Sequence, residues 1–364
     1  MLKTNTPGAE QVKSRNSGKS ADGDGSLKLA LIILAKNEEK NIGRFLQSLA
    51  TQTLFDRRNI EATLYVVANG CSDRTAQVAR ENASEALLSR GVKSEILDWT
   101  TPGKSRSWNR VVHEVLPSDV DYVLAMDADI EFVDDLVLAA MFDRIGSSPK
   151  LQVVSGLPVK DIARKARPTL VDRFSMSISG LTRHSESING SLYLATASCL
   201  SEIWLPDQTP GEDGFLNAMV RTRGFSQPRQ SNVIVQMHEP THYFESHSAV
   251  AFFAHEKRMI VGTMINRWIF EHLHSLRLSQ PAGPYIKRLN KENPEWVGAI
   301  IAERSTHAWL IPNALLFRRL VPKQGLTASY LLRLPILLLA TFLTAPPAFM
   351  ANRALKKIGA ESLW

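Results

Sequence analysis

Cysteine is nearly missing from this 364-residue chain, in which only Cys71 and Cys199 occur. Two cysteines cannot build a disulfide scaffold or supply a zinc cluster with thiolate ligands. We interpret both as small buried residues, because unpaired cysteine is among the most frequently buried residue types. Their scarcity is typical of a reducing compartment.

A continuous apolar run is missing from residues 1–26, so we expect no secretory signal peptide there. This segment is polar and is broken by glycine, serine and lysine. A chain of that composition cannot bury enough apolar surface to fold. We therefore expect a disordered leader.

Extremes of composition are also missing, since 44% of the residues are hydrophobic and 22% are charged. This mixture excludes global disorder, collagen and a pure coiled coil. Basic residues outnumber acidic ones by 43 to 36, which gives a net charge of +7. The surplus suggests an anionic partner, which could be a phosphorylated ligand, a membrane surface or a nucleic acid.

Short apolar runs alternate with helix-like patterns in the first half of the chain. The runs are residues 29–35, 62–68, 94–97, 122–126 and 151–155. Continuous runs of this length are typical of strands buried on both faces. The alternation predicts an α/β fold with a mostly parallel sheet and helices on both faces. Ligands of such sheets bind beyond the carboxyl ends of the strands.

Polar side chains occur where the first four expected strands end or where the next helix begins. They are Lys36, Asn37, Glu38 and Glu39, then Asn69, Ser72 and Asp73, then Lys104 and Ser105, and finally Asp127 and Asp129. In a sheet of this type, these groups are expected to converge on one crevice. None of the four loops has the GxGxxG pattern of a dinucleotide site.

Two carboxylates, those of Asp127 and Asp129, directly follow an apolar strand. Hard divalent cations such as Mg²⁺ or Mn²⁺ prefer oxygen ligands and take one or two carboxylates together with substrate phosphates. An Asp-x-Asp sequence at a strand end provides that arrangement. The alternative is that the two acids begin the loop and cap the helix expected near Asp134.

Several short motifs follow one another in a fixed order along the chain. They lie in residues 33–42, residues 66–75, Gly103-Lys104 with Asn109, residues 126–130, residues 189–194, and residues 211–216 followed by Arg221 and Gly224. In order and spacing they resemble the family 2 glycosyltransferases, which have the GT-A fold. The resemblance covers about residues 27–237 and implies a nucleotide-sugar-dependent enzyme.

The resemblance implies a donor site. The two aspartates of the Asp-x-Asp motif would hold a metal ion that stabilises the leaving diphosphate. Lys104 would help to neutralise the phosphates, although a solvated lysine at a helix start is equally consistent with the residue. Glu38 and Asn69 match positions that contact the nucleoside in the family. The family often has Asp where this chain has Ala68 or Asn69, so UDP and GDP both stay open.

The resemblance also implies an acceptor site. Asp213 would be the general base that takes the proton from the acceptor hydroxyl group, as in inverting members of the family. Glu212 would orient the acceptor or the helix. The residues alone allow a simpler explanation, because Glu212 and Asp213 both favour a helix N-terminus. Asp73 is more simply explained as a helix cap.

Three histidines follow the last strand expected in this region, namely His238, His242 and His247. Some related enzymes use a histidine there as a further metal ligand, which makes His238 a candidate. The alternative is a loop with scattered histidines.

The C-terminal third has two apolar features. From residue 248 the pattern is that of a long amphipathic helix, which could pack on the catalytic domain or lie on a membrane. Residues 334–351 are 18 residues without a charge. Positive charge flanks both sides, and Pro346-Pro347 interrupts the stretch. This pattern favours a re-entrant or in-plane membrane element, with a complete span and a buried core helix as alternatives.

The expected organisation is a leader (1–26), a GT-A glycosyltransferase domain (27–245), a helical extension (246–330) and a membrane-associated tail (331–364). The expected function is metal-assisted transfer from a UDP- or GDP-linked sugar to a glycan or lipid-linked acceptor at the cytoplasmic face of a membrane.

Two alternatives stay open. A nucleotidyltransferase would commonly have a glycine-rich basic loop after the first strand, whereas Lys36-Asn37-Glu38-Glu39 is acidic and lacks glycine. A basic membrane-binding or nucleic-acid-binding protein would fit the charge. The basic residues are dispersed, however, and no nucleic-acid motif supports that class.

Overall fold

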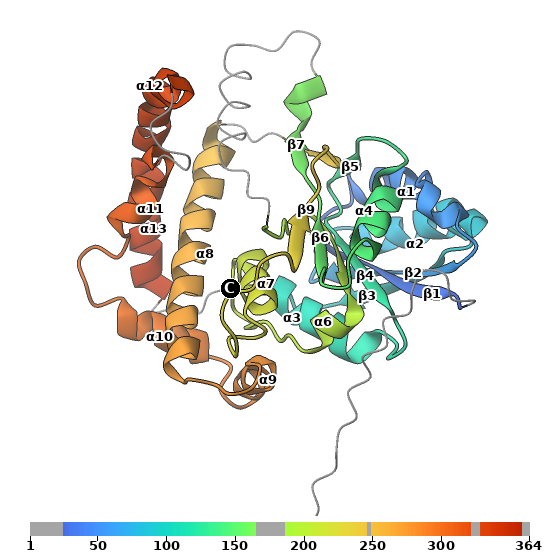
Figure 1. Ribbon diagram of the computed structural model, residues 1–364, viewed down its shortest axis with the longest axis horizontal. Coiled ribbons are helices and arrows are strands. Elements are labelled where there is room, and N and C mark those ends of the chain that lie inside the picture. Colours follow the sequence, from blue (N-terminus) through green and yellow to red (C-terminus); the bar gives the residue numbers. More distant parts are fainter. Residues whose placement is uncertain (1–24, 165–185, 246–248, 322–327, 359–364) are drawn as a thin grey trace, which may run out of the picture.

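A seven-stranded sheet is the centre of the molecule (Figure 1). The computed structural model describes residues 25–164, 186–245, 249–321 and 328–358. The sheet order is β3-β2-β1-β4-β8-β6-β9. The strands are β1 (Leu27–Ala35), β2 (Ile60–Asn69), β3 (Lys93–Trp99), β4 (Tyr122–Met126), β6 (Val153–Ser155), β8 (Leu192–Thr196) and β9 (Ile234–Gln236). Only β8 runs antiparallel to its neighbours in this sheet, so the predicted mostly parallel sheet is confirmed.

Helices connect the strands on both sides of the sheet. They are α1 (Ile42–Ala50), α2 (Thr75–Ala86), α3 (Lys104–Arg110), α4 (Val137–Gly146), α6 (Ala197–Ser201) and α7 (Glu212–Arg221). A π-helical turn, Val111–Val115, continues α3 up to the residues before Pro117. This parallel-sheet arrangement with helices on both faces confirms the predicted α/β fold class.

Side chains of β1 alternate between two hydrophobic cores, as the period of a strand requires. Leu29, Leu31 and Ile33 belong to the core beneath α1, α2 and α4. Ala30 and Ile32 belong to the opposite core, which continues through α3 and α7 into the C-terminal helices. The sheet is therefore buried on both faces, which explains the continuous apolar runs in its sequence.

A small second sheet lies beside the first, in the order β5-β10-β7. Its strands are β5 (Glu131–Phe132), β7 (Pro158–Lys160) and β10 (His242–Phe244). Because β5 begins two residues after Asp129, this sheet holds the far end of the Asp-x-Asp loop.

Three sequence expectations need correction. The fourth helix begins at Val137 rather than at Asp134, because the Asp134 carboxylate accepts a hydrogen bond from the backbone of Leu136 and forms a turn there. The strand expected at 151–155 begins at Val153. Both cysteines are half-buried rather than buried.

The C-terminal helices stand beside the sheet-bearing part (Figure 1). They are α8 (Ala249–Ser275), α9 (Gly283–Glu292), α10 (Trp296–Arg304), α11 (Asn313–Leu316), α12 (Ala328–Phe342) and α13 (Ala345–Ile358). The long helix α8 packs within the protein, because Ile265 and Ile269 share a core with Phe215 of α7 and Leu355 of α13. The predicted leader lies outside the described residues, apart from Gly25 and Ser26, and the other expected domain boundaries stay predictions.

The uncharged stretch of the tail divides into two helices. Helix α12 ends at Phe342, and α13 begins at Ala345 with Pro346 and Pro347 in its first turn. Proline is tolerated in a first turn, where its missing N–H would have no helical partner. Pro335 lies inside α12. By length and composition, the segment Tyr330–Ile358 is long and apolar enough to cross a membrane.

We predict that Leu355→Ala destabilises the protein by about 2–5 kcal/mol, because Leu355 is fully buried between α13 and α8. The matched control is Leu332→Ala on α12, where the side chain is 83% exposed and the expected change is within about 0.5 kcal/mol. Chemical denaturation of both variants provides the measurement. Equal losses of stability would contradict the packing described for the tail.

Candidate functional site

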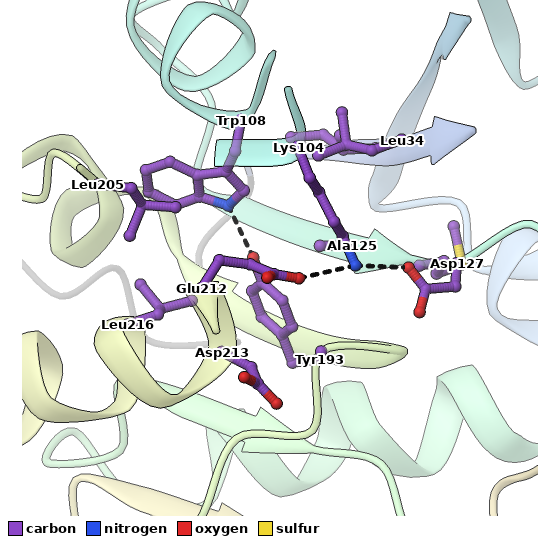
Figure 2. Close-up of a pocket in the computed structure, with 13 residues that line it drawn as sticks. Leu34, Lys104, Trp108, Ala125, Asp127, Tyr193, Leu205, Glu212, Asp213 and Leu216 are labelled. Atoms are coloured by element: carbon purple, nitrogen blue, oxygen red, sulfur yellow. Dashed lines mark hydrogen bonds and ion pairs between the residues drawn. The ribbon is translucent and has the colours of Figure 1, made fainter. Parts of the chain in front are cut away.

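A pocket lies where β4, β8, α3 and α7 meet, and several predicted site residues line it (Figure 2). It has about 400 Å³ of space, part of which is open to solvent. Its polar lining comes from Lys104, Asp127, Glu212 and Asp213. Its apolar lining comes from Ile32, Leu34, Trp108, Ala125, Met126, Leu205 and Leu216. The sheet therefore brings Lys104, Asp127 and the Glu212-Asp213 pair together, although they are far apart in the chain.

Lys104 is the central cation of this pocket. Its Nζ lies 3.0 Å from Oδ1 of Asp127 and 2.9 Å from Oε1 of Glu212 (Figure 2). Burial alone would lower the pKa of Lys104, but the attraction of the two carboxylates outweighs burial and holds its pKa above the ordinary value. Lys104 is therefore a charged group that links the strand end of β4 to the start of α7. Lys104 is the first residue of α3 and its side chain is 38% exposed, so it is ion-paired and partly solvated.

Asp213 lies beside this ion-paired group, at the start of α7 (Figure 2). Its carboxylate accepts a hydrogen bond of 2.7 Å from the backbone N–H of Gly214. Burial, and secondarily the negative charge of Glu212, raise the pKa of Asp213 above its ordinary value. A Cβ atom at Gly190 would lie 3.2 Å from Cβ of Asp213, so the glycine leaves the approach to this carboxylate open. A carboxylate with a raised pKa is better suited to accept a proton than an ordinary one.

The donor-side carboxylates lie close enough to influence one another. Glu38 has a raised pKa, chiefly because of burial, although a hydrogen bond from Asn41 opposes the shift, and the charges of Asp129 and Asp127 raise it further. Asp127 is partly buried and Asp129 is exposed. Within the described residues, no group of three or more His, Cys, Asp or Glu side chains is placed to hold a metal ion. Two carboxylates nevertheless fit a hard divalent cation whose other ligands come from substrate phosphates and water.

Asn69 is buried at the end of β2, and its carbonyl oxygen has structural partners. It accepts hydrogen bonds from the backbone N–H of Gly103 at 3.0 Å and from the hydroxyl of Ser107 at 2.9 Å. Gly103 has a φ of 142°, which favours glycine at this turn before α3. The side-chain oxygen of Asn69 thus orients the turn that carries Lys104. A contact with a nucleoside would use its amide N–H groups.

Other predicted residues have structural roles in the folded chain. Asp73 accepts a hydrogen bond of 3.0 Å from the backbone of Thr75, the first residue of α2, although the N-cap position itself is occupied by Arg74. His242 is fully buried and bonded to Ser191 and Thr241, and burial lowers its pKa to about 3. His238 is exposed, and His247 lies outside the described residues.

Two buried aromatic residues at the floor of the pocket were missed by the sequence reasoning. The indole N–H of Trp108 donates a hydrogen bond of 2.8 Å to the hydroxyl of Tyr193 (Figure 2). Tyr193 lies within the 189–194 motif, and Trp108 precedes Asn109 in another motif, so both were adjacent to segments already singled out. Their contact depends on the pairing of β8 with β4, which no local pattern reveals.

Comparison with known proteins gives one family match. Residues 30–199 match the model described as Glycosyl transferase family 2. No curated protein matches the chain. The matched residues include Lys104, Asp127 and Asp129, whereas α7, with Glu212 and Asp213, lies beyond them.

Solved structures of one bacterial enzyme are similar to part of the chain. Glucosyl-3-phosphoglycerate synthase from Mycobacterium tuberculosis, in complex with Mn²⁺, uridine diphosphate and glucosyl-3-phosphoglycerate, has a TM-score of 0.45 and 16% identity, covering 66% of this chain and 80% of that chain. The same enzyme with Mg²⁺ and uridine diphosphate has a TM-score of 0.45 and 15% identity, covering 66% and 79%.

We predict that Lys104→Met lowers stability at pH 7 by roughly 1–2 kcal/mol, a value reduced because the lysine is partly exposed. The substitution leaves the carboxylate of Asp127 without the cation that lowers its pKa, so this pKa, which burial already raises, rises further above its value in the unfolded chain. Protonation then stabilises the variant as the pH falls, and the difference from wild type narrows at pH 5.

Thermal unfolding at the two pH values tests this prediction. The control is Lys93→Met, which changes an exposed lysine at the start of β3. A Lys104→Met deficit that is the same at both pH values would contradict the shared-cation role.

Proposed function

We propose that this chain is a glycosyltransferase of family 2 and that it transfers a sugar from a nucleotide-diphosphate donor to an acceptor hydroxyl group. The observation that carries the proposal is the single pocket in which Asp127, Lys104 and Asp213 meet. Asp127 suits the counter-cation of a diphosphate, and Lys104 suits the diphosphate itself. Asp213 suits the removal of a proton from an acceptor. Residues 36–39, directly after β1, have a net charge of −1 and lack glycine, which disfavours a nucleotidyltransferase.

The donor side of the pocket would bind the diphosphate, which is the leaving group. Asp127 and Asp129 would hold Mg²⁺ or Mn²⁺ together with the diphosphate oxygens, and the ion would supply stabilisation of the negative charge that develops there. Lys104 adds a second positive charge at the same edge of the sheet. Glu38, and the amide N–H groups of Asn69, would contact the nucleoside of a UDP- or GDP-linked sugar.

The acceptor side would carry the base. Asp213 would take the proton from the attacking hydroxyl group, which leads to inversion at the anomeric carbon. Glu212 has one oxygen on Lys104, so its role is to fix the position of the α7 N-terminus relative to the donor side. We propose a glycan or lipid-linked acceptor and a location at the cytoplasmic face of a membrane.

We predict that Asp213→Asn lowers the rate of sugar transfer by about 10²–10⁴-fold, because the amide cannot accept the proton. Asp129→Ala is expected to raise the metal concentration needed for activity by more than about 100-fold. A screen of UDP- and GDP-sugars with Mn²⁺ or Mg²⁺ measures both. Asp98→Ala, an exposed carboxylate on β3, is the matched control. Unchanged turnover in both site variants would sink the mechanism.

The raised pKa of Asp213 makes a further prediction about pH. The base must be deprotonated, so kcat/KM falls as the pH drops through its pKa, and the acid limb lies above the ordinary range for an aspartate. The charge of Lys104 lowers this pKa, so Lys104→Met moves the limb to higher pH. pH–rate profiles of wild type and variant provide the measurement. A limb that stays in place would show that a group other than Asp213 controls it.

A further inference from the structure

We propose that α12 is an in-plane docking surface for an anionic lipid bilayer, and that the tail does not span the membrane. The proposal deepens the membrane location included in the proposed function. It rests on three observations: the apolar face that α12 leaves exposed, the charge of the surrounding segment, and the attachment of α13 to the rest of the protein.

The exposed apolar face extends from α12 into the start of α13. The side chains concerned are Leu331, Leu332, Leu338, Leu339, Phe342, Phe349 and Met350, with exposed fractions between 45% and 83%. This is half of the 14 large hydrophobic residues that are exposed in the described chain, gathered within 20 residues. A continuous exposed patch of this kind marks an interaction site, and leucine and phenylalanine are typical of helices that lie in a membrane interface.

In the longer segment that contains α12 and α13, all of the Lys, Arg, Asp and Glu residues are basic. Residues 304–360 contain eight basic residues and no acidic one. The segment therefore contributes +8 to a chain whose net charge is +7, so the remainder has a net charge of −1. Arg353 and Lys356 are exposed on α13, on the same helix face as Phe349 and Met350, and Arg333 is exposed near the start of α12. An apolar face bordered by basic side chains complements the surface of an anionic bilayer. An acidic protein groove would complement only the basic side chains.

Helix α13 is attached to the folded protein by both packing and hydrogen bonds. Its Ala348, Ala351 and Leu355 belong to the main hydrophobic core. The side chain of Asn352 accepts a hydrogen bond of 2.8 Å from the backbone of Leu310 and donates one to the backbone oxygen of Ala308. A helix held in this way cannot also be surrounded by lipid.

The length of α12 then excludes a span. Without α13, the available helix has 15 residues, which measure about 22 Å at 1.5 Å per residue. The hydrocarbon core of a bilayer is about 30 Å thick. The helix can therefore lie in the interface with its apolar face inward, but it cannot cross. Of the three arrangements that the sequence allows, the structure favours the in-plane one.

Sedimentation of the full chain with vesicles tests the proposal. We expect binding to vesicles of phosphatidylcholine with phosphatidylglycerol, weaker binding to phosphatidylcholine alone, and release by alkaline carbonate. The apolar variant Leu332→Ser/Leu339→Ser/Phe342→Ser is expected to lose binding. Each of Arg333→Gln, Arg353→Gln and Lys356→Gln is expected to weaken binding to the anionic vesicles about fivefold.

The matched control is Leu88→Ser/Leu136→Ser, which removes two exposed leucines from the sheet-bearing part and is expected to bind as wild type. Because the apolar variant changes only exposed positions, its unfolding temperature and its nucleoside-diphosphate binding are expected to match those of wild type. This comparison separates the docking surface from the catalytic proposal, since vesicle binding requires no turnover.

Three results would overturn the proposal. Retention in the pellet after carbonate treatment would indicate a span. Equal binding by the apolar variant would place the lipid contact elsewhere. A lipid-free dimer in light scattering that the apolar variant converts to monomer would show that a second copy of the chain covers this face.

Discussion

The interaction on which the site depends is the pair of ion contacts made by Lys104. Its ammonium group lies within 3.0 Å of the carboxylate of Asp127, directly after β4, and of the carboxylate of Glu212, at the start of α7. Without it, Asp127 and Glu212 would face the same pocket as two uncompensated negative charges, and the start of α7 would be repelled from the sheet. The lysine therefore sets the distance between the donor-side carboxylates and Asp213. It does so at the place where a diphosphate would bring further negative charge.

The sequence predicts the parallel half of this architecture well, because strands buried on both faces leave continuous apolar runs. The first four strands lie where those runs indicate, and the helices α1, α2 and α3 follow the first three of them, as the predicted alternation requires. The antiparallel strand β8 is different. Its insertion between β4 and β6 depends on contacts between residues far apart in the chain, and so does the hydrogen bond between Trp108 and Tyr193.

The site residues divide in the same way. Asp127, Asp129 and Lys104 were found because each stands at a strand end or a helix start, which is a local feature. These local patterns cannot reveal that Lys104 forms ion pairs with Asp127 and Glu212 at the same time. Asn69 shows the limit of transferring a role by position, since its carbonyl oxygen is occupied by Gly103 and Ser107. The tail shows it too, because its hydropathy alone allows a span, whereas in the structure α13 packs against the rest of the protein.

The positive charge of the chain is unevenly distributed. The segment 304–360 holds the whole surplus of positive charge, and the remainder of the chain is nearly neutral. The pocket contains one lysine among several carboxylates. This arrangement favours the binding of a divalent cation together with an anionic ligand over the binding of an anion alone. Calorimetric titration of the wild-type chain with UDP and GDP tests this most directly. The account predicts that one of the two binds in the presence of Mn²⁺ and that a chelator abolishes the binding. Equal affinity with and without the metal would contradict it.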